Sequence, residues 1–312
     1  MQPGRVNFRR TRLACSGSRS ERSHNASLRI VYGPEILTRF LATPSPPDKY
    51  GNAWQYHPRS DRHSKVGCWG IAFDLLRTSA LLRQHVTEGK VVLGVNHTMV
   101  DHSTSRSKDL DLVIARPASG GKAPSESFRS LAHRYGIELL PDEIQALEDL
   151  PEFPVAPVGA VLVALEAKAA MTAHVKALPR LYDELNSAHQ AIHGASKQAL
   201  AIAYVQINAA TLYASPTQNL RNLSDFPIVL SRHKQPTSVE RVMAKVRELP
   251  RRSSTRDTGF DGIGITVLSF ENQGGPVELV KAAPSPLPGD QYEYAQMITR
   301  MANEYDGTFA RI

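Results

Sequence analysis

Long runs of apolar residues along the chain predict the strands of a central β-sheet. The clearest is 160–168, in which six apolar residues precede Glu166. A continuous apolar run of this length is typical of a central strand that is covered on both faces. Further strands are predicted at 91–97, 108–116, 199–207 and 262–270. A turn rich in Ser and Thr joins the first two of these, so we expect an antiparallel hairpin.

Apolar residues at helical spacing predict helices around these strands. In the region 67–88 they include Ile71, Leu75 and Leu82, and Gly89 follows as a stop. Further helices are predicted at 125–135, 142–150, 173–189, 238–248 and 292–304. The helix 173–189 would connect two parallel strands by a right-handed crossover. The order α-β-β-β-α-β predicts an α/β fold with a mixed central β-sheet flanked by helices.

Changes in composition predict how the chain is divided. Residues 1–62 are rich in Arg, Ser, Pro and Gly and have weak periodicity, which predicts a flexible basic arm with one short helix at 34–41. The folded domain is then expected at 63–312. Within it, a helical insertion is predicted at 117–157 and a basic C-terminal region at 232–256.

Composition and charge restrict the class of protein. An apolar fraction of 41% in 312 residues is enough for a real core, and a net charge of +7 favours polyanionic partners. The cysteines Cys15 and Cys68 are too few for a disulfide framework or a zinc ribbon. No apolar run is long enough to cross a membrane. The arginine-rich start lacks an apolar segment after it, which excludes a secretory signal and leaves a basic arm or a transit peptide. We expect a cytoplasmic protein.

Charged residues in two of the predicted strands indicate a catalytic site. Asp109 and Asp111 should share one face of their strand, and Glu166 and Lys168 one face of theirs, because side chains alternate along a strand. If the strands are neighbours, three carboxylates and an amine meet at one edge. Mg²⁺ prefers oxygen ligands and keeps several waters, so Asp111, Glu166 and the backbone carbonyl of Ala167 would suffice, with Asp109 as a secondary ligand.

Lys168 would then orient or deprotonate the attacking water, or offset charge on the phosphate. The simpler interpretation is that Glu166 and Lys168 form an ordinary charged strand end, with solvated acids on the neighbouring strand.

The combination of Asp111 with the pair Glu166 and Lys168 resembles the PD-(D/E)xK nuclease superfamily, which includes type II restriction endonucleases and DNA-repair nucleases. The predicted α-β-β-β-α-β order over 67–208 is also that of the family core. Leu110 stands where the motif has proline, and a long insertion separates the acid from the Glu–Lys pair. The resemblance implies catalytic roles for Asp111, Glu166 and Lys168, Mg²⁺ as cofactor and double-stranded DNA as substrate.

Basic residues outside these strands are candidates for DNA contacts, with solvated helix faces as the alternative. Positions at the start of the helix 173–189 suit a phosphate backbone, and Arg241 and Lys245 share one helical face. The candidates are His174, Lys176, Arg180, Arg241 and Lys245.

The leading hypothesis is a Mg²⁺-dependent DNA endonuclease, specifically a homodimeric, site-specific restriction endonuclease that defends against foreign DNA. The alternatives are a structure-directed nuclease of DNA repair or recombination, and a non-catalytic DNA-binding protein with a degraded nuclease fold.

Overall fold

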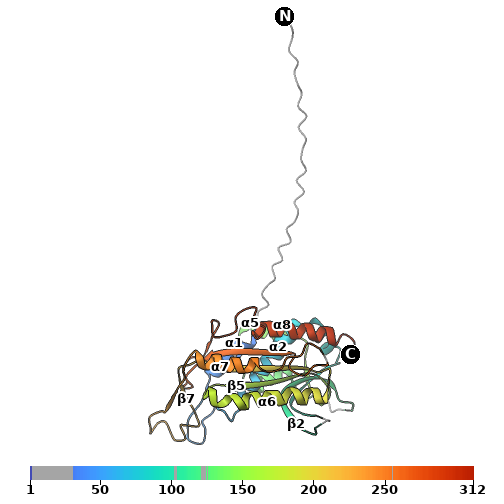
Figure 1. The fold of residues 1–312 in the computed structure, drawn as a ribbon. Helices are drawn as coiled ribbons and strands as arrows, with labels where there is room; N and C mark the ends of the chain where they lie inside the picture. Colours follow the sequence, from blue (N-terminus) through green and yellow to red (C-terminus); the bar gives the residue numbers. More distant parts are fainter. Residues whose placement is uncertain (2–30, 102–103, 121–123, 125, 255) are drawn as a thin grey trace. The chain divides into compact units, whose positions relative to one another are not determined.

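A mixed β-sheet forms the centre of the unit Val31–Ile312 in the computed structural model (Figure 1). The structure describes Met1 and residues 31–101, 104–120, 124, 126–254 and 256–312. The eight strands described for this sheet have the order β10-β9-β6-β5-β2-β1-β4-β3. They are β1 (Val92–Val100), β2 (Ser107–Pro117), β3 (Glu126–Ser127), β4 (Pro154–Val155), β5 (Val158–Ala170), β6 (Leu200–Asn208), β9 (Gly262–Ser269) and β10 (Glu278–Leu279). A second small sheet pairs β7 (Leu212–Ala214) with β8 (Leu230–Arg232).

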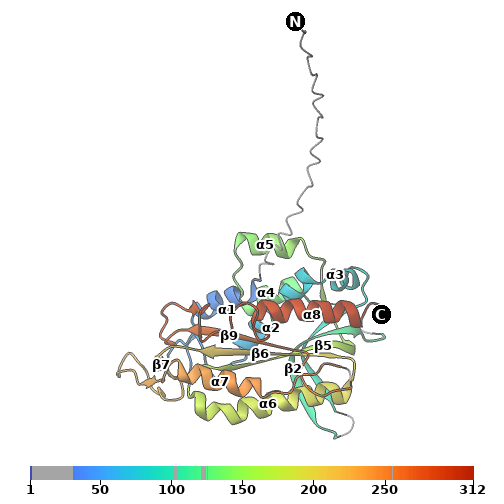
Figure 2. The ribbon, with the colours of Figure 1, turned by 45° about the horizontal axis from the view of Figure 1, so that its top comes forward.

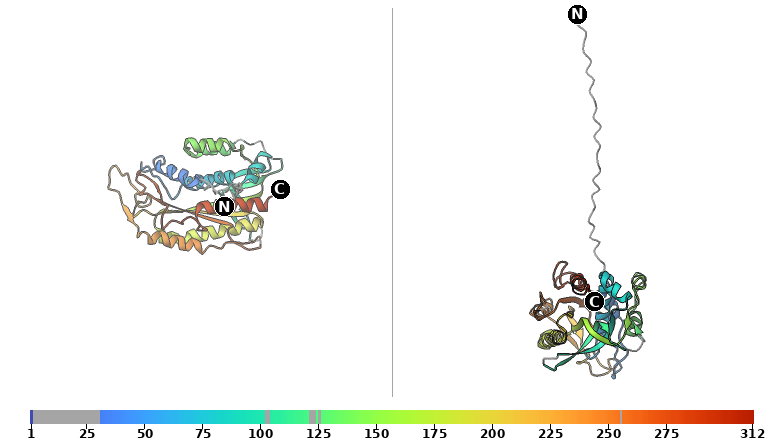
Figure 3. Two further views of the ribbon diagram at one scale, coloured as in Figure 1. Left: turned by 90° about the horizontal axis from the view of Figure 1, so that it is seen from above. Right: turned by 90° about the vertical axis from the view of Figure 1, so that its right-hand side faces the viewer.

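Helices cover both faces of the large sheet (Figures 2 and 3). They are α1 (Gly33–Ala42), α2 (Arg62–Thr78), α3 (Ala80–Thr87), α4 (Phe128–Tyr135), α5 (Pro141–Glu148), α6 (His174–Ala195), α7 (Thr237–Arg247) and α8 (Tyr294–Thr308). Apolar residues of α6 and α7 form the core on one face, and those of α1 to α4 and α8 form the core on the other. None of the described helices is long and apolar enough to span a bilayer.

The predicted α/β fold with a mixed central sheet is confirmed. β1 and β2 form the predicted antiparallel hairpin, and β2 also pairs antiparallel with β5. β5 and β6 are parallel and α6 connects them, as predicted for the β-α-β unit. The apolar run in β5 is buried because the sheet is covered on both faces at this strand.

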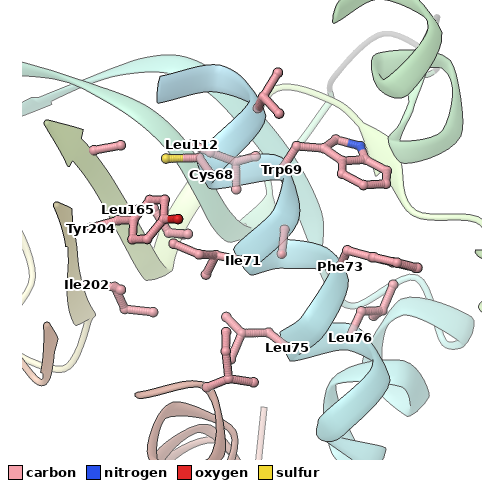
Figure 4. Close-up of a cluster of buried hydrophobic side chains, with 14 of the residues drawn as sticks. Cys68, Trp69, Ile71, Phe73, Leu75, Leu76, Leu112, Leu165, Ile202 and Tyr204 are labelled. Carbon is pink, nitrogen blue, oxygen red and sulfur yellow. The ribbon is translucent and has the colours of Figure 1, made fainter. Parts of the chain in front are cut away.

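Helix α2 is the centre of the larger core (Figure 4). Its residues Trp69 and Phe73 are fully buried, and the Trp69 ring stacks on Phe128 of α4 with ring centroids 4.6 Å apart. The Trp69 indole N–H also donates to the Phe128 carbonyl oxygen at 3.0 Å. These contacts attach the predicted insertion 117–157 to the core.

The folded unit begins earlier than predicted, at Val31 instead of residue 63. Ile36 and Leu37 of α1 are buried, and α1 packs so closely on α2 that a Cβ on Gly70 would lie 2.8 Å from the Gly33 Cα. The Asp74 carboxylate of α2 accepts the Gly33 N–H at 2.8 Å. Trp54 and Tyr56, which follow α1 in the predicted arm, are buried as well, although this part of the sequence has no sustained apolar period. Residues 2–30 of the predicted arm lie outside the described residues.

The predicted helix 67–88 is two helices that meet at Ser79. The Ser79 hydroxyl accepts the Leu82 N–H at 2.9 Å and so caps α3. A serine that bonds the backbone in this way allows the chain to turn while the apolar spacing continues.

Candidate active site

The end of β5 carries the predicted Glu–Lys pair. Glu166 is 1% exposed, and the Lys168 Nζ lies 2.7 Å from its Oε1 atom, so the two side chains share a face as predicted. Lys108 of β2 places its Nζ 3.2 Å from the same oxygen. A buried carboxylate is costly unless it is paired, and here two ammonium groups compensate it.

Asp111 lies where β2 and β5 separate. The paired register of the two strands begins at Leu112↔Leu165, and beyond it the Asp111 Oδ2 accepts the Ala167 N–H at 2.8 Å. Leu110 and Leu112 belong to the cores on opposite faces, although they are two residues apart. Regular alternation would place them on one face. The alternation therefore breaks at Asp111, where a side chain replaces a backbone acceptor.

Asp109 lies apart from this arrangement. It is exposed and accepts a hydrogen bond from the Thr98 hydroxyl of β1. The alternation argument that placed Asp109 and Asp111 together does not hold at the break in β2.

The environment of Asp111 disfavours its charged form. Burial, followed by the negative charge of Glu166, raises the pKa of Asp111 to about 6. The Ala167 N–H, the Lys168 ammonium and the Ser64 hydroxyl act in the opposite direction. A carboxylate whose charged form is disfavoured by burial and by a neighbouring carboxylate is a frequent property of functional sites.

Lys168 is held in its charged form. Burial alone would lower its pKa, but Glu166, Asp111 and Glu184 outweigh burial, so the pKa of Lys168 is raised. Glu184 of α6 lies 3.5 Å from the Lys168 Nζ. The neighbouring His63 is neutral near pH 7, because burial and then Lys168 lower its pKa to about 4.

The five predicted DNA contacts differ in position. His174 is 3% exposed, its Nε2 lies 2.9 Å from the Asn208 carbonyl oxygen, and its ring packs edge-on against His233. It lies in the interior and cannot meet a phosphate there. The burial of His174 could not be predicted from the sequence. Ala173, just before α6, has a left-handed backbone (φ 49°), and this turn sets the direction in which the His174 side chain points.

The other four residues lie nearer the surface. Lys176 and Arg241 are exposed. Arg180 places its Nε 2.6 Å from Glu184 Oε1, and the half-buried Lys245 places its Nζ 2.6 Å from Glu248 Oε2.

Part of the basic region 232–256 is structural. Arg252 is 4% exposed, places its Nε 2.6 Å from Asp261 Oδ1, and donates to the carbonyl oxygens of Lys197 and Ala199. This arginine fixes the connection between α6 and β6 and does not contribute a free positive charge to the surface.

A basic groove beside Asp111 was missed by the sequence analysis. It consists of two hollows of about 720 and 600 Å³ that share Val95, Asn96 and Arg134. Its charged and histidine lining is Arg62, Lys65, Arg134, His97, His133, Asp61 and Glu126. Asn96 and Asp111 lie between the paired positions Val95↔Leu112 and His97↔Leu110.

Cations in this groove are partly paired. The Lys65 Nζ lies 2.6 Å from Asp61, and the Arg134 Nη1 lies 2.7 Å from Glu126. Arg62 lies over the Phe40 ring, with its Cζ 4.8 Å from the ring centroid. The sequence signal was the basic start of α2, which the predicted arm boundary concealed.

Whether the site can hold a metal ion depends on Asp111, Glu166 and the backbone carbonyl of Ala167. Among the described residues, no group of three or more His, Cys, Asp or Glu side chains is arranged to hold a metal ion. The negative charge of Glu166 nevertheless disfavours the charged form of Asp111, and a divalent cation would relieve this. The N–H and C=O of a strand residue point to the same side, so the Ala167 carbonyl faces β2, as its N–H does. This oxygen-only set fits Mg²⁺, which keeps several waters.

No protein-family model, curated protein or solved structure matches the chain. Functional assignment therefore depends on the geometry of the site.

Proposed function

We propose that the protein is a Mg²⁺-dependent DNA endonuclease with a restriction endonuclease-like core. The observation that carries the proposal is the convergence of Asp111, Glu166 and Lys168 where β2 and β5 separate. An acid from one strand and a Glu-x-Lys from its neighbour supply ligands for a metal and a positive charge for a phosphodiester. Asp111 lies far from Glu166 and Lys168 in the sequence, so it is the fold that brings the three residues together.

The order and pairing of the elements support the same proposal. The elements α2, β1, β2, β5, α6 and β6 follow the expected α-β-β-β-α-β order once α3 and the insertion after β2 are set aside. β1 pairs antiparallel with β2, β2 pairs antiparallel with β5, and β5 pairs parallel with β6.

Asp111, Glu166 and the Ala167 carbonyl would hold the Mg²⁺. The bound ion would polarise the scissile phosphodiester and lower the pKa of a water. Lys168 carries a proton at neutral pH, so it stabilises negative charge on the phosphate and orients the water, and does not serve as the base. Asp109, exposed on β2, is assigned an outer role at most.

Incubation with Mg²⁺ and long unmethylated DNA tests the proposal. We expect cleavage that chelation by EDTA abolishes. Discrete fragments would identify a site-specific enzyme of the restriction type, which we propose acts as a homodimer. A smear would identify a structure-directed or nonspecific nuclease. DNA that is bound but uncut under these conditions would contradict the nuclease proposal and identify a DNA-binding protein.

The basic groove should carry part of the DNA affinity. Replacing both Arg62 and Lys65 with alanine should weaken binding and reduce the slope of log K against log salt by about one to two, because each lost phosphate contact releases about one counterion fewer. Titration of labelled duplex at several salt concentrations measures the slope. The double variant Lys176→Ala/Arg241→Ala removes equal charge from α6 and α7 and should change the slope less. The opposite ranking would place the DNA against α6 and α7 instead.

A further inference from the structure

Exposed apolar side chains gather in one loop of the protein. Of the ten large hydrophobic residues that are exposed in the described chain, four lie between Leu220 and Leu230. They are Leu220, Phe226, Val229 and Leu230. Phe226 is 49% exposed, and Leu220 is 58% exposed. Such a concentration on a loop marks an interaction surface.

The loop has a fixed shape. Asn219, fully buried at its base, donates to the carbonyl oxygens of Ser215 and Val229 at 2.9 Å, and its Oδ1 accepts the Val229 N–H at 2.8 Å. From outside the loop, the Asn52 amide donates to the Arg221 carbonyl oxygen at 2.7 Å. Because these bonds already fix the loop, little further conformational entropy would be lost when its apolar side chains bind a partner.

The loop projects from the end of the sheet that carries the candidate active site. β7 and β8, which support it, follow β6, and β6 runs parallel to β5. His233, just after β8, places its Nε2 3.2 Å from the Thr172 hydroxyl, four residues beyond Lys168. Figures 1 and 2 show the loop beside β7 extending past the end at which α6 begins.

Cationic residues lie in the loop and directly after it. The Arg221 guanidinium lies over the Phe226 ring, 4.9 Å from its centroid. Arg232 and Lys234, both exposed, follow the loop, and Asp225 is its one acid. Apolar side chains flanked by cations suit duplex DNA, whose stacked bases lie between two lines of phosphates.

We propose that the loop 215–230 inserts Phe226, supported by Leu220, between bases of duplex DNA and unstacks a base step beside the active site. The inference rests on the proposed function for its DNA substrate. A rigid apolar projection suits a duplex, because unstacking must be driven, whereas bases of a single strand are already accessible. A second copy of the chain would gain little from the surrounding cations, which would face each other across a symmetric interface.

Fluorescence of 2-aminopurine, which rises when the base unstacks, tests the inference without cleavage. Short duplexes carrying 2-aminopurine at several adenine positions are titrated with the full chain in EDTA. Wild-type protein should raise the fluorescence. Phe226→Ala should lose most of this rise and bind about tenfold more weakly, the scale of one lost base–aromatic contact. The control Leu287→Ala changes a residue that is also 49% exposed but lies outside the loop, and should behave like wild type.

The outcomes separate the inference from the proposed nuclease activity. Wild-type protein that unstacks the duplex but never cuts it with Mg²⁺ would support the inference and contradict the nuclease proposal. Cleavage by wild-type protein, together with unchanged fluorescence and affinity in the double variant Leu220→Ala/Phe226→Ala, would overturn the inference and leave the nuclease proposal in place. A double variant that changes only from dimer to monomer in sedimentation would also overturn it, and would assign the loop to contact between two copies.

Discussion

Replacing Lys168 with alanine should lower the rate of DNA cleavage at least about a hundredfold while DNA binding stays almost unchanged. The Lys168 ammonium lies against Glu166 and stays protonated, so its removal takes away the charge that offsets the phosphate. Binding should survive, because we expect the cations of the basic groove, which Lys168 does not line, to supply most of the DNA affinity. Single-turnover cleavage and a gel-shift titration measure the two effects separately.

Two controls make this result specific. Lys90→Ala removes a lysine from a surface pair with Glu88 and should leave the cleavage rate unchanged. Thermal melting of the Lys168 variant checks the fold, since Glu166 keeps Lys108 as a partner. A folded Lys168 variant that cuts DNA at a near-normal rate would remove Lys168 from the active site.

Replacing Asp111 with asparagine should abolish cleavage and, unusually for an active-site change, stabilise the protein at pH 8. The asparagine oxygen can still accept the Ala167 N–H, so the local geometry survives. The variant lacks the carboxylate that burial and Glu166 disfavour, and the gain should be on the order of 2 kcal/mol. Urea denaturation with and without Mg²⁺ measures it. Mg²⁺ should stabilise wild-type protein and not the variant.

The pH dependence follows from the same group. The pKa of Asp111 is about 6 in the folded protein, above the ordinary value for aspartate. The folded protein therefore binds this proton more tightly, so its contribution to stability is full at low pH and is lost as pH rises through about 6. Asp74, whose pKa is also about 6 because of burial, contributes in the same direction. The difference between wild type and Asp111→Asn isolates the Asp111 part. Cleavage should fall at low pH as Asp111 takes up its proton, and a higher Mg²⁺ concentration should offset the loss, because Mg²⁺ and the proton would compete for this carboxylate.

Asp109→Asn is the matched control, because it removes the same charge from the same strand at an exposed position. It should change neither the cleavage rate nor the stabilisation by Mg²⁺ beyond a few-fold. If Asp109→Asn abolished activity at every Mg²⁺ concentration and Asp111→Asn did not, Asp109 would be the metal ligand.

The central elements could be predicted because long buried strands appear in the sequence as continuous apolar runs, and the crossover helix appears between two of them. The apolar run before Glu166 has to be a buried strand, and the pair Glu166 and Lys168 stays regular within it. α6 and β6 follow the same logic, since a parallel pair needs a crossover between its strands.

The parts that could not be predicted depend on contacts between distant segments. The alternation of side chains along β2 breaks at Asp111, where the carboxylate accepts the Ala167 N–H of β5, and no local sequence pattern predicts a bond of this kind. The short helix at 34–41 was predicted and is α1, but its attachment to α2 through Asp74 was not. His174 is polar yet buried, because the Asn208 carbonyl oxygen and the His233 ring meet it there.

The bond from Asp111 to Ala167 also bears on how descendants of this gene would change. Because the side chain at position 111 completes the hydrogen bonding of the sheet, folding itself favours an aspartate or asparagine there. Selection for a folded protein would preserve a hydrogen-bond acceptor at this position after catalysis had ceased, and asparagine would serve as well as aspartate or better. Lys168, whose amine serves the carboxylates around it, has no such tie to the backbone. Among divergent copies of this gene, loss of the lysine would mark the inactive ones, and a hydrogen-bond acceptor at position 111 would not by itself identify the active ones.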